Sequence, residues 1–204
     1  MSEAEVRRER PGEGPIAARV LADAFIEEGG LNYWLRQGRP KESARQRFFD
    51  AVVADVMHPK REIWLAETQG QPLGSAIWLP PGAVAFDLHG WNEIAVTPLL
   101  FRIAGLKGMG RALRLGKMLE RRHPREPHWH LAFLGVATAA QGQGMGSALL
   151  KRTLAPVDAQ GVAAYLETTT ERNVALYRRH GFEVTDRFEL PGVTFWTMTR
   201  PARG

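Results

Sequence analysis

Apolar and polar positions form three distinct patterns in succession over residues 130–150. An unbroken apolar run from Leu131 to Val136 has the length and the Val and Phe content of a strand buried on both faces. A stretch of small residues follows, and then the glycine-rich segment Gln141–Gly146. Apolar residues next recur at helical spacing, at Met145, Leu149, Leu150 and Leu154. The pattern predicts a strand, a glycine-rich turn and a helix.

Helical and strand patterns also divide the N-terminal part of the chain. Residues 1–14 are charged and contain Gly and Pro, which is typical of a loosely ordered N-terminus with at most a short edge strand over 5–8. Periodicity predicts these elements next, in order: a helix over Ile16–Glu28 that Gly29-Gly30 ends, a helix over Glu42–His58, and strands over Arg61–Thr68 and Leu73–Leu79 that a hairpin turn joins.

The stretch between residues 83 and 127 has the least regular pattern. It is mixed up to Val96, and from Pro98 to Arg122 it predicts one long helix or two shorter ones. The expected interruptions are its glycines, Gly105, Gly108 and Gly110. Its cations share one face, which we expect to be solvated: Arg111, Arg114, Lys117, Arg121 and Arg122.

The predicted glycine-rich turn has the physical properties of an anion site. The first N–H groups of a helix have no partner within it, and the helix dipole adds partial positive charge there. Glycines let a phosphate or pyrophosphate approach the backbone closely. Gly142, Gly144 and Gly146 fit neither a P-loop, which needs a Lys-Ser/Thr pair, nor the G-x-G-x-x-G spacing of dinucleotide-binding turns. A tight turn without a ligand is the alternative interpretation.

The segment Gln141-x-x-Gly144-x-Gly146 resembles the (Gln/Arg)-x-x-Gly-x-(Gly/Ala) motif of the GCN5-related N-acetyltransferase superfamily. Thr138 departs from the family pattern, since many members have Pro there. A second block, in the family's order, resembles its later part: Leu166-Glu167-Thr168, then Asn173-Val174-Ala175-Leu176-Tyr177, then Gly181-Phe182. The resemblance implies the family's α/β fold over residues 1–204 as a single domain, with a mixed twisted sheet of about six or seven strands and helices on both faces.

The resemblance also implies acetyl-coenzyme A as the co-substrate, with its pyrophosphate on the glycine-rich loop. Backbone groups of the preceding strand would bind the pantetheine arm and the thioester, and a bulge there would splay this strand from its neighbour. The residues implied for the cofactor are Leu134, Gly135, Val136, Gln141, Gly142, Gln143, Gly144, Met145, Gly146, Ser147 and Asn173.

Other residues resemble a group within that superfamily, the puromycin N-acetyltransferases. They are Glu126-Pro127-x-Trp129, Arg172-Asn173 and Trp196-x-Met198-Thr199-Arg200. This likeness implies that the acceptor is the primary amine of a small molecule, such as an aminonucleoside or another antibiotic, and thus a role in antibiotic resistance. A protein N-terminus or lysine is the alternative acceptor. A coenzyme A-binding sensor or pseudoenzyme is the alternative of another class.

Acetylation of an amine needs a base for the ammonium proton and an acid for the leaving thiolate. With no cysteine and no G-x-S-x-G elbow, direct attack is favoured over a covalent route. The resemblance implies Tyr177 as the acid, because a phenol stays protonated at pH 7; packing inside the protein is its alternative role. Glu167, whose pKa burial would raise, and His130 are equal candidates for the base, with a water chain as the third.

Strand alternation places His130 on the same face as Ala132, Leu134 and Val136. His123 and His128 lie near it in the sequence and invite a metal hypothesis, but no further protein ligand is evident nearby. We therefore expect no metal.

Three aromatic residues are candidates for contact with the acceptor. Tyr33 and Trp34 follow a flexible glycine pair, in the region where the family's loop between its first two helices helps to wall the acceptor site. Trp78 lies near the end of a predicted strand. Core packing is the alternative role for all three.

The composition is that of an ordinary globular protein, with 44% apolar and 24% charged residues among 204. The net charge of +5 suits solubility and attraction of an anionic cofactor; the basic residues are scattered and no stacking motif interleaves them, so we do not expect nucleic-acid binding. The absence of cysteine excludes disulfides and zinc–thiolate sites. No signal core or membrane-length run is present, so we expect a cytoplasmic protein, a monomer or a homodimer, without a membrane partner.

Overall fold

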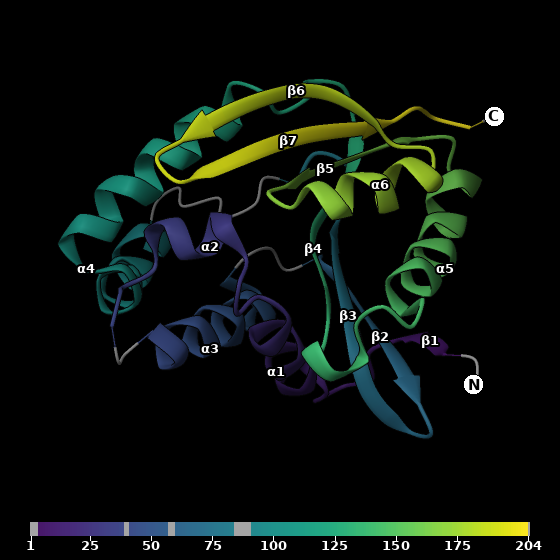
Figure 1. Ribbon diagram of the computed structural model, residues 1–204, viewed down its shortest axis with the longest axis horizontal. Helices are drawn as coiled ribbons and strands as arrows, with labels where there is room; N and C mark the ends of the chain where they lie inside the picture. The colour runs from purple at the N-terminus through teal and green to yellow at the C-terminus, as the bar shows by residue number, and fades with distance from the viewer. Residues whose placement is uncertain (1–3, 39–40, 57–59, 84–90, 204) are drawn as a thin grey trace.

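A seven-stranded mixed sheet forms the centre of the computed structural model, which describes residues 4–38, 41–56, 60–83 and 91–203 (Figure 1). The strands are β1 (Glu5–Arg8), β2 (Glu62–Thr68), β3 (Gln71–Leu79), β4 (His128–Val136), β5 (Ala163–Thr168), β6 (Glu183–Leu190) and β7 (Val193–Arg200). Their order in the sheet is β1-β2-β3-β4-β5-β7-β6. Of these neighbouring pairs, β4 and β5 are parallel and the others are antiparallel.

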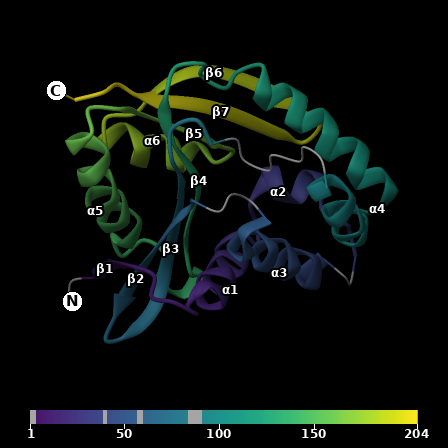
Figure 2. The ribbon, with the colours of Figure 1, turned by 180° about the vertical axis from the view of Figure 1, so that it is seen from behind.

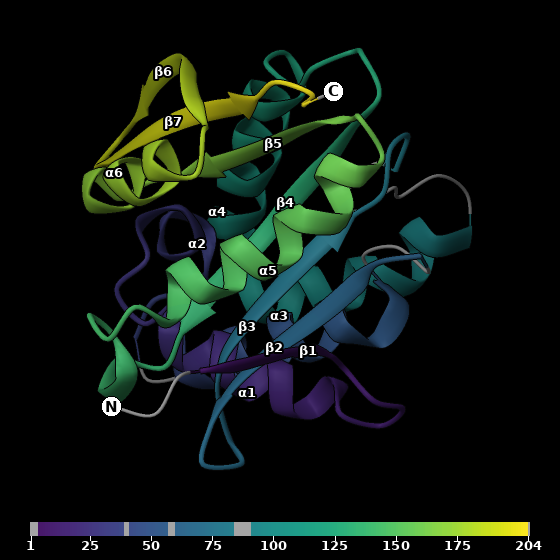
Figure 3. The ribbon, with the colours of Figure 1, turned by 90° about the vertical axis from the view of Figure 1, so that its right-hand side faces the viewer.

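Helices cover both faces of this sheet. They are α1 (Gly14–Ala24), α2 (Gly29–Trp34), α3 (Lys41–Ala51), α4 (Trp91–Glu120), α5 (Met145–Ala159) and α6 (Glu171–Arg179). Figure 3 shows α5 in front of the sheet with α1 and α3 behind it, and Figure 2 shows α2, α3 and α4 gathered on one side. The predicted α/β fold, with about six or seven strands and helices on both faces, is confirmed.

Each face of the sheet has its own hydrophobic core. On one face, residues of α1 to α4 such as Leu21 and Phe49 pack against Ile77 of β3. On the other face, Leu149 of α5 and Tyr177 of α6 belong to a second cluster. The sheet therefore separates two layers of helices, and a residue's position along a strand decides which layer it meets.

The pair Gly29-Gly30 begins a helix instead of ending one, so the predicted helix over Ile16–Glu28 is wrong at its C-terminal end. α1 already ends at Ala24, and α2 starts at Gly29. The reason is a side-chain cap, because the Glu28 carboxylate accepts hydrogen bonds from the N–H groups of Gly30 at 2.9 Å and Leu31 at 2.5 Å. The expected loop around Tyr33 and Trp34 is consequently helical.

The segment α4 resolves the choice between one helix and two. Gly105 has φ 66° and ψ 176°, so two helical pieces meet there. The chain stays helical through Gly108 and Gly110, where interruptions were also expected. Gly108 serves packing, since a Cβ atom there would lie 2.2 Å from the carbonyl oxygen of Trp34 on α2. Part of the stretch that we interpreted as mixed, residues 84–90, lies outside the described ranges.

Two other predicted elements differ at their ends. The helix expected to reach His58 is α-helical only to Ala51, and a π-helical turn over Val52–Val56 follows it; His58 itself is outside the described residues. The strand predicted from Leu73 begins two residues earlier, at Gln71, because the hairpin between β2 and β3 turns at Gln69 and Gly70. The φ angles of these two residues are 53° and 74°. Positive φ at both positions is the type I′ geometry that matches strand twist.

A bulge in β4 reverses the strand parity that we expected for His130. Ile77 of β3 pairs with Phe133, but the next residue of β3 pairs with Leu131, so Ala132 is extra. Leu134 packs with the α5 core, whereas Ala132 packs with the opposite core. The extra residue moves every later side chain to the other face. His130 therefore does not share a face with Leu134 and Val136, and that prediction is wrong.

Candidate active site

The strands β4 and β5 separate part-way along their length. Their parallel pairing covers only three residue pairs, from His128↔Ala163 to His130↔Tyr165. Beyond His130, β4 continues beside β3 to Val136, while β5 continues beside β7. Figure 1 shows the two strands diverging. The facing edges of β4 and β5 beyond this point have no strand partner in one another, so their backbone groups are available to a ligand.

The glycine-rich loop leads into α5 with the geometry that an anion site requires. Gly142 has φ 78°, and Gly144, the residue that precedes the helix, has φ 85°. Only glycine adopts these angles without strain. A Cβ atom at either position would meet no protein atom within 4 Å, so both glycines border open space. The loop thus presents the unpaired N–H groups of the first turn of α5 to that space.

Two polar residues hold this loop. The Gln141 side-chain amide donates to the Val136 carbonyl at 3.2 Å, which ties the loop to the end of β4. The Gln141 side-chain oxygen Oε1 accepts a hydrogen bond from the guanidinium of Arg172 on α6 at 3.4 Å. Arg172 is a residue to which the sequence interpretation gave no site role, and it brings a cation to the edge of the anion loop. A guanidinium pairs well with phosphate oxygens.

The other residues expected at the cofactor differ in where their side chains lie. Gly135 is required by packing, because a Cβ atom there would come within 2.7 Å of Ala24 on α1. Met145 is buried in the α5 core. The Ser147 hydroxyl forms a 2.7 Å hydrogen bond with a ring nitrogen of His180, a partner that the sequence did not suggest. Gly135 and Met145 therefore have only backbone groups to offer a cofactor. Gln143 donates to the Ala139 carbonyl at 3.3 Å.

Tyr177 and Asn173 share one face of α6, one turn apart. Tyr177 is only 5% exposed, and its ring lies 5.9 Å from that of Phe182. Burial raises the pKa of its phenol, and the carboxylate of Glu28 raises it further. The hydroxyl consequently stays protonated well above neutral pH, and it forms no hydrogen bond with any residue in the described ranges.

His130 and Glu167, the two alternatives for the base, form one pair. The His130 ring nitrogen Nε2 lies 2.8 Å from the Glu167 oxygen Oε2, where the two strands begin to separate. Their side chains are 8% and 15% exposed. Burial raises the pKa of Glu167, but the charge and hydrogen bond of His130 outweigh it and hold the pKa below its ordinary value. The raised pKa that we expected for Glu167 is therefore wrong.

Two more histidines and a tyrosine extend this pair. The ring of His123 lies 5.2 Å from that of His130 and 4.9 Å from that of Tyr165, centroid to centroid. His123 and His128 approach to 3.0 Å between their Nε2 atoms. Burial lowers the pKa of both, that of His123 to about 4. Across the described ranges, His, Cys, Asp and Glu side chains form no group of three or more suited to a metal ion.

Glu28 is a second acid at this opening that sequence reasoning missed. The Thr169 hydroxyl, just after β5, donates a hydrogen bond to the Glu28 carboxylate. The same carboxylate caps α2 and raises the pKa of Tyr177. The signal was present in the sequence as an acid before Gly-Gly, which is compatible with a helix cap. Its place beside β5 depends on contacts between residues 141 positions apart.

The aromatic candidates for acceptor contact lie apart from one another. Trp78 is 1% exposed within the α5 core. Trp34 is 8% exposed and packs edge-on against Phe48, with ring centroids 5.4 Å apart. Tyr33 is partly buried at the opposite core, and its carbonyl accepts from Arg111 at 3.0 Å. Of the three, Tyr33 has the most accessible side chain.

A family of known proteins matches this combination of fold and loop. Residues 30–182 match the family described as the Acetyltransferase (GNAT) family. The chain belongs to this family. Membership makes it an acetyl-CoA-dependent acyltransferase of the N-acetyltransferase type, and the family uses acetyl-CoA as its acetyl donor. Within the described ranges, no helix of this GNAT enzyme combines the length and the apolar character needed to span a bilayer.

Individual relatives agree with this assignment. An uncharacterised N-acetyltransferase of Schizosaccharomyces pombe is 25% identical over 178 residues, which are 81% of this chain and 69% of the relative. A solved protein structure from Corynebacterium glutamicum is described as histone acetyltransferase HPA2 and related acetyltransferase. It has a TM-score of 0.77 and 25% identity to this chain, and the match covers 100% of this chain and 98% of the other. The Drosophila melanogaster polyamine N-acetyltransferase shares the fold, with a TM-score of 0.66 at 17% identity over 98% and 100% of the two chains.

Proposed function

We propose that this GNAT enzyme transfers the acetyl group of acetyl-CoA directly to the primary amine of a small molecule. One observation carries the proposal: the hydrogen-bonded pair of buried His130 and half-buried Glu167 stands at the point where β4 and β5 separate. Tyr177 belongs to the core on the other face of the sheet. An acid and a base on opposite sides of one opening suit a reaction in which a donor enters from one face and an acceptor from the other.

The residues at the opening fit acetyl-CoA as a donor. Open space around Gly142 and Gly144, the N-terminus of α5 and the guanidinium of Arg172 suit a pyrophosphate. The unpaired edge of β4 around Leu134 and Val136 suits an amide-containing arm. Asn173 on α6 has a side-chain amide for the same arm. Acetyl-CoA supplies an acetyl group activated as a thioester.

The pair of His130 and Glu167 takes the proton of the ammonium group. His130 bonds only one carboxylate oxygen, Oε2, and Glu167 is the more exposed of the two side chains. We therefore assign contact with the amine to the carboxylate, which His130 holds through its hydrogen bond to Oε2. The 2.8 Å hydrogen bond between Nε2 and Oε2 joins the two side chains into one unit at the opening. Of the three alternatives for the base, Glu167, His130 and a water chain, we thus propose the first two acting together.

As the new C–N bond forms and the C–S bond breaks, Tyr177 is proposed to give its phenolic proton to the departing sulfur. The second proton that the amine nitrogen loses restores the phenol. The raised pKa of Tyr177 keeps the phenol protonated at neutral pH, and its hydroxyl has no competing hydrogen bond within the described ranges. Backbone N–H groups on the free edge of β4 stabilise negative charge on the oxygen of the group under attack. Because the chain has no cysteine to carry an acyl group, we propose direct attack of the amine on the thioester.

The proposed acceptor is a small primary amine, with puromycin as one representative. The acids Glu28 and Glu167 border the opening, and both attract a cationic amine. The residues that resemble puromycin N-acetyltransferases support this class. A lysine side chain of a protein is the second candidate, because the Corynebacterium glutamicum relative is described as a histone acetyltransferase.

The test measures thiol release from acetyl-CoA with a panel of amines that includes puromycin, polyamines and a lysine peptide. We expect release with a small amine, and a rate lower by about 10²-fold or more in Tyr177→Phe, as for loss of a general acid. CoA affinity, measured by calorimetry, should stay within about twofold. Faster release with the peptide would move the acceptor to protein lysine. CoA binding without release for any amine would indicate a sensor instead of an enzyme.

A further inference from the structure

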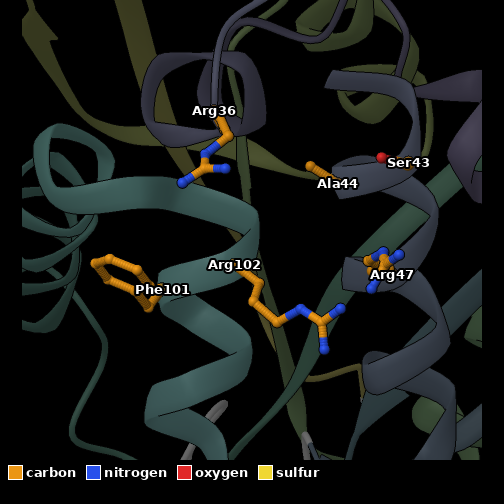
Figure 4. Close-up of a pocket in the computed structure, with 6 residues that line it drawn as sticks. All are labelled: Arg36, Ser43, Ala44, Arg47, Phe101 and Arg102. Carbon is orange, nitrogen blue, oxygen red and sulfur yellow. The ribbon is translucent and has the colours of Figure 1, made fainter. Parts of the chain in front are cut away.

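Three arginines surround a cavity that lies away from the glycine-rich loop. The cavity has a volume of about 300 Å³ and lies between the end of α2, α3 and the first part of α4 (Figure 4). That is the small end of the range for ligand pockets, roughly 300–1,000 Å³. Its lining consists of Arg36, Ser43, Ala44, Arg47, Phe101 and Arg102. This lining contains no acidic side chain.

The three guanidinium groups come from separate elements and extend into one gap. Figure 4 shows Arg102 reaching from α4 toward α3, where Arg47 lies, while Arg36 extends from the segment after α2. None of the three forms an ion pair or a side-chain hydrogen bond with another residue of the described ranges. Other arginines of the chain, such as Arg7 and Arg200, have carboxylate partners. Like charges around one cavity repel, so this arrangement favours an anion between them.

Local backbone features hold Arg36 at the cavity. The N–H of Arg36 donates to the Ile103 carbonyl at 2.8 Å, which joins the end of α2 to α4. Gly105, where the two pieces of α4 meet, leaves room for the same residue: a Cβ atom there would lie 3.3 Å from the Arg36 Nε atom. The break in α4 and the position of Arg36 therefore belong together. Phe101, 46% exposed, forms an apolar rim beside the charges.

We propose that this cavity binds a small polyanion, a molecule with two or more phosphate or carboxylate groups, through Arg36, Arg47 and Arg102. Guanidinium forks pair with either group in a bidentate manner, which suits a compact ligand with several oxygens. The cavity lies among the helices of one face of the sheet, whereas the glycine-rich loop leads into α5 on the other face (Figure 3). The site is distinct from the pyrophosphate loop and does not depend on the proposed acetyl transfer.

The test titrates pyrophosphate and citrate into the protein by calorimetry at constant ionic strength, with CoA saturating so that the glycine-rich loop is occupied. The variant Arg47→Gln/Arg102→Gln removes two cavity charges. Its matched control, Arg114→Gln/Arg121→Gln, removes two exposed charges from the same helical region, outside the cavity. A repeat of the titration without CoA measures probe binding at the cavity even if the loop binds no cofactor.

We expect saturable binding of at least one probe to the wild type. The cavity variant should bind about tenfold more weakly or worse, as for loss of a charge-assisted hydrogen bond, and the control should stay within about twofold. Binding of pyrophosphate alone would assign a phosphate-bearing ligand, and binding of citrate alone a carboxylate-bearing one. No saturable binding of either probe would overturn the proposal. So would an equal loss in both variants, because only net charge would then matter.

Discussion

The substitution Gly144→Ala tests whether the loop before α5 is a ligand cradle or only a turn. Gly144 has φ 85°, where an L-residue costs roughly 1–2 kcal/mol. No protein atom lies within 4 Å of the added Cβ, so no clash adds to this strain. For a chain of this length, about 1 kcal/mol lowers Tm by roughly 2–4 °C. The expected loss of Tm is therefore about 2–8 °C, by the same scaling.

Gly192→Ala is the matched control for this strain. Gly192 has φ 82°, and its Cβ also meets nothing within 4 Å, but it lies in the turn between β6 and β7. Both variants should lose a similar amount of stability. Only Gly144→Ala places a methyl group in the space that we assign to the pyrophosphate, which would cost one or more charge-assisted hydrogen bonds of about 1.5–3 kcal/mol.

Isothermal titration calorimetry with CoA separates the two variants. We expect a dissociation constant about 10- to 150-fold higher for Gly144→Ala, from the free energy of the lost hydrogen bonds, and an unchanged one for Gly192→Ala. Thermal denaturation checks that the stability losses match. If Gly144→Ala bound CoA as tightly as the wild type, the loop would be a turn without a ligand. An equal weakening in both variants would mean that lost stability explains the result.

Two further predictions concern stability. Asp158→Ala leaves the buried guanidinium of Arg200 (3% exposed) without its ion pair and should lower the free energy of unfolding by about 3 kcal/mol. Glu189→Ala, which removes an exposed ion pair with Arg187, should lower it by less than about 1 kcal/mol. Urea denaturation of both variants compares the two losses. Burial lowers the pKa of His123 from 6.5 to about 4, so between these pH values the unfolded chain binds a proton that the folded chain does not. The free energy of unfolding should fall as pH drops through this window, and an equally steep fall in His123→Gln would refute this cause.

Local patterns were sufficient to predict the strand, loop and helix around Gly144. Each of these elements depends on residues close together in the sequence, and β4, the positive-φ glycines and α5 occur where the pattern places them. The hairpin between β2 and β3 is local in the same way. The resemblance to the family added the mixed sheet of about six or seven strands with helices on both faces, which periodicity alone does not give.

The parity of His130 failed because a bulge is a property of two strands and not of one. The extra residue, Ala132, is visible only in the pairing of β4 with β3. The bulge reverses the alternation after His130, so Leu134 packs with the α5 core and not on the face that His130 occupies. His130 and Glu167 are 37 positions apart, and the parallel pairing of β4 with β5 brings them together. The sequence offered them as alternatives because it contains no sign of this contact.

Contacts between elements far apart in the chain likewise could not be predicted from the sequence. In the sequence Glu28 has the character of an ordinary surface acid. Its contact with Thr169 is evident only once the structure places the start of α2 beside the end of β5. The arginines of the cavity occur in three separate segments, and only the packing of α2, α3 and α4 brings them around one space. Residues that act across such distances have no periodic signature.

The central claim is that the His130–Glu167 pair is the base of an acetyl transfer, and Glu167→Gln tests it most directly. The experiment is a single turnover, with acetyl-CoA saturating and an amine that the wild type accepts. The account predicts that amide formation slows by about 10²- to 10⁴-fold, as for loss of a general base, while the CoA dissociation constant stays within about twofold. An amide-forming rate equal to that of the wild type would contradict the account, because proton removal would then need no carboxylate at this position.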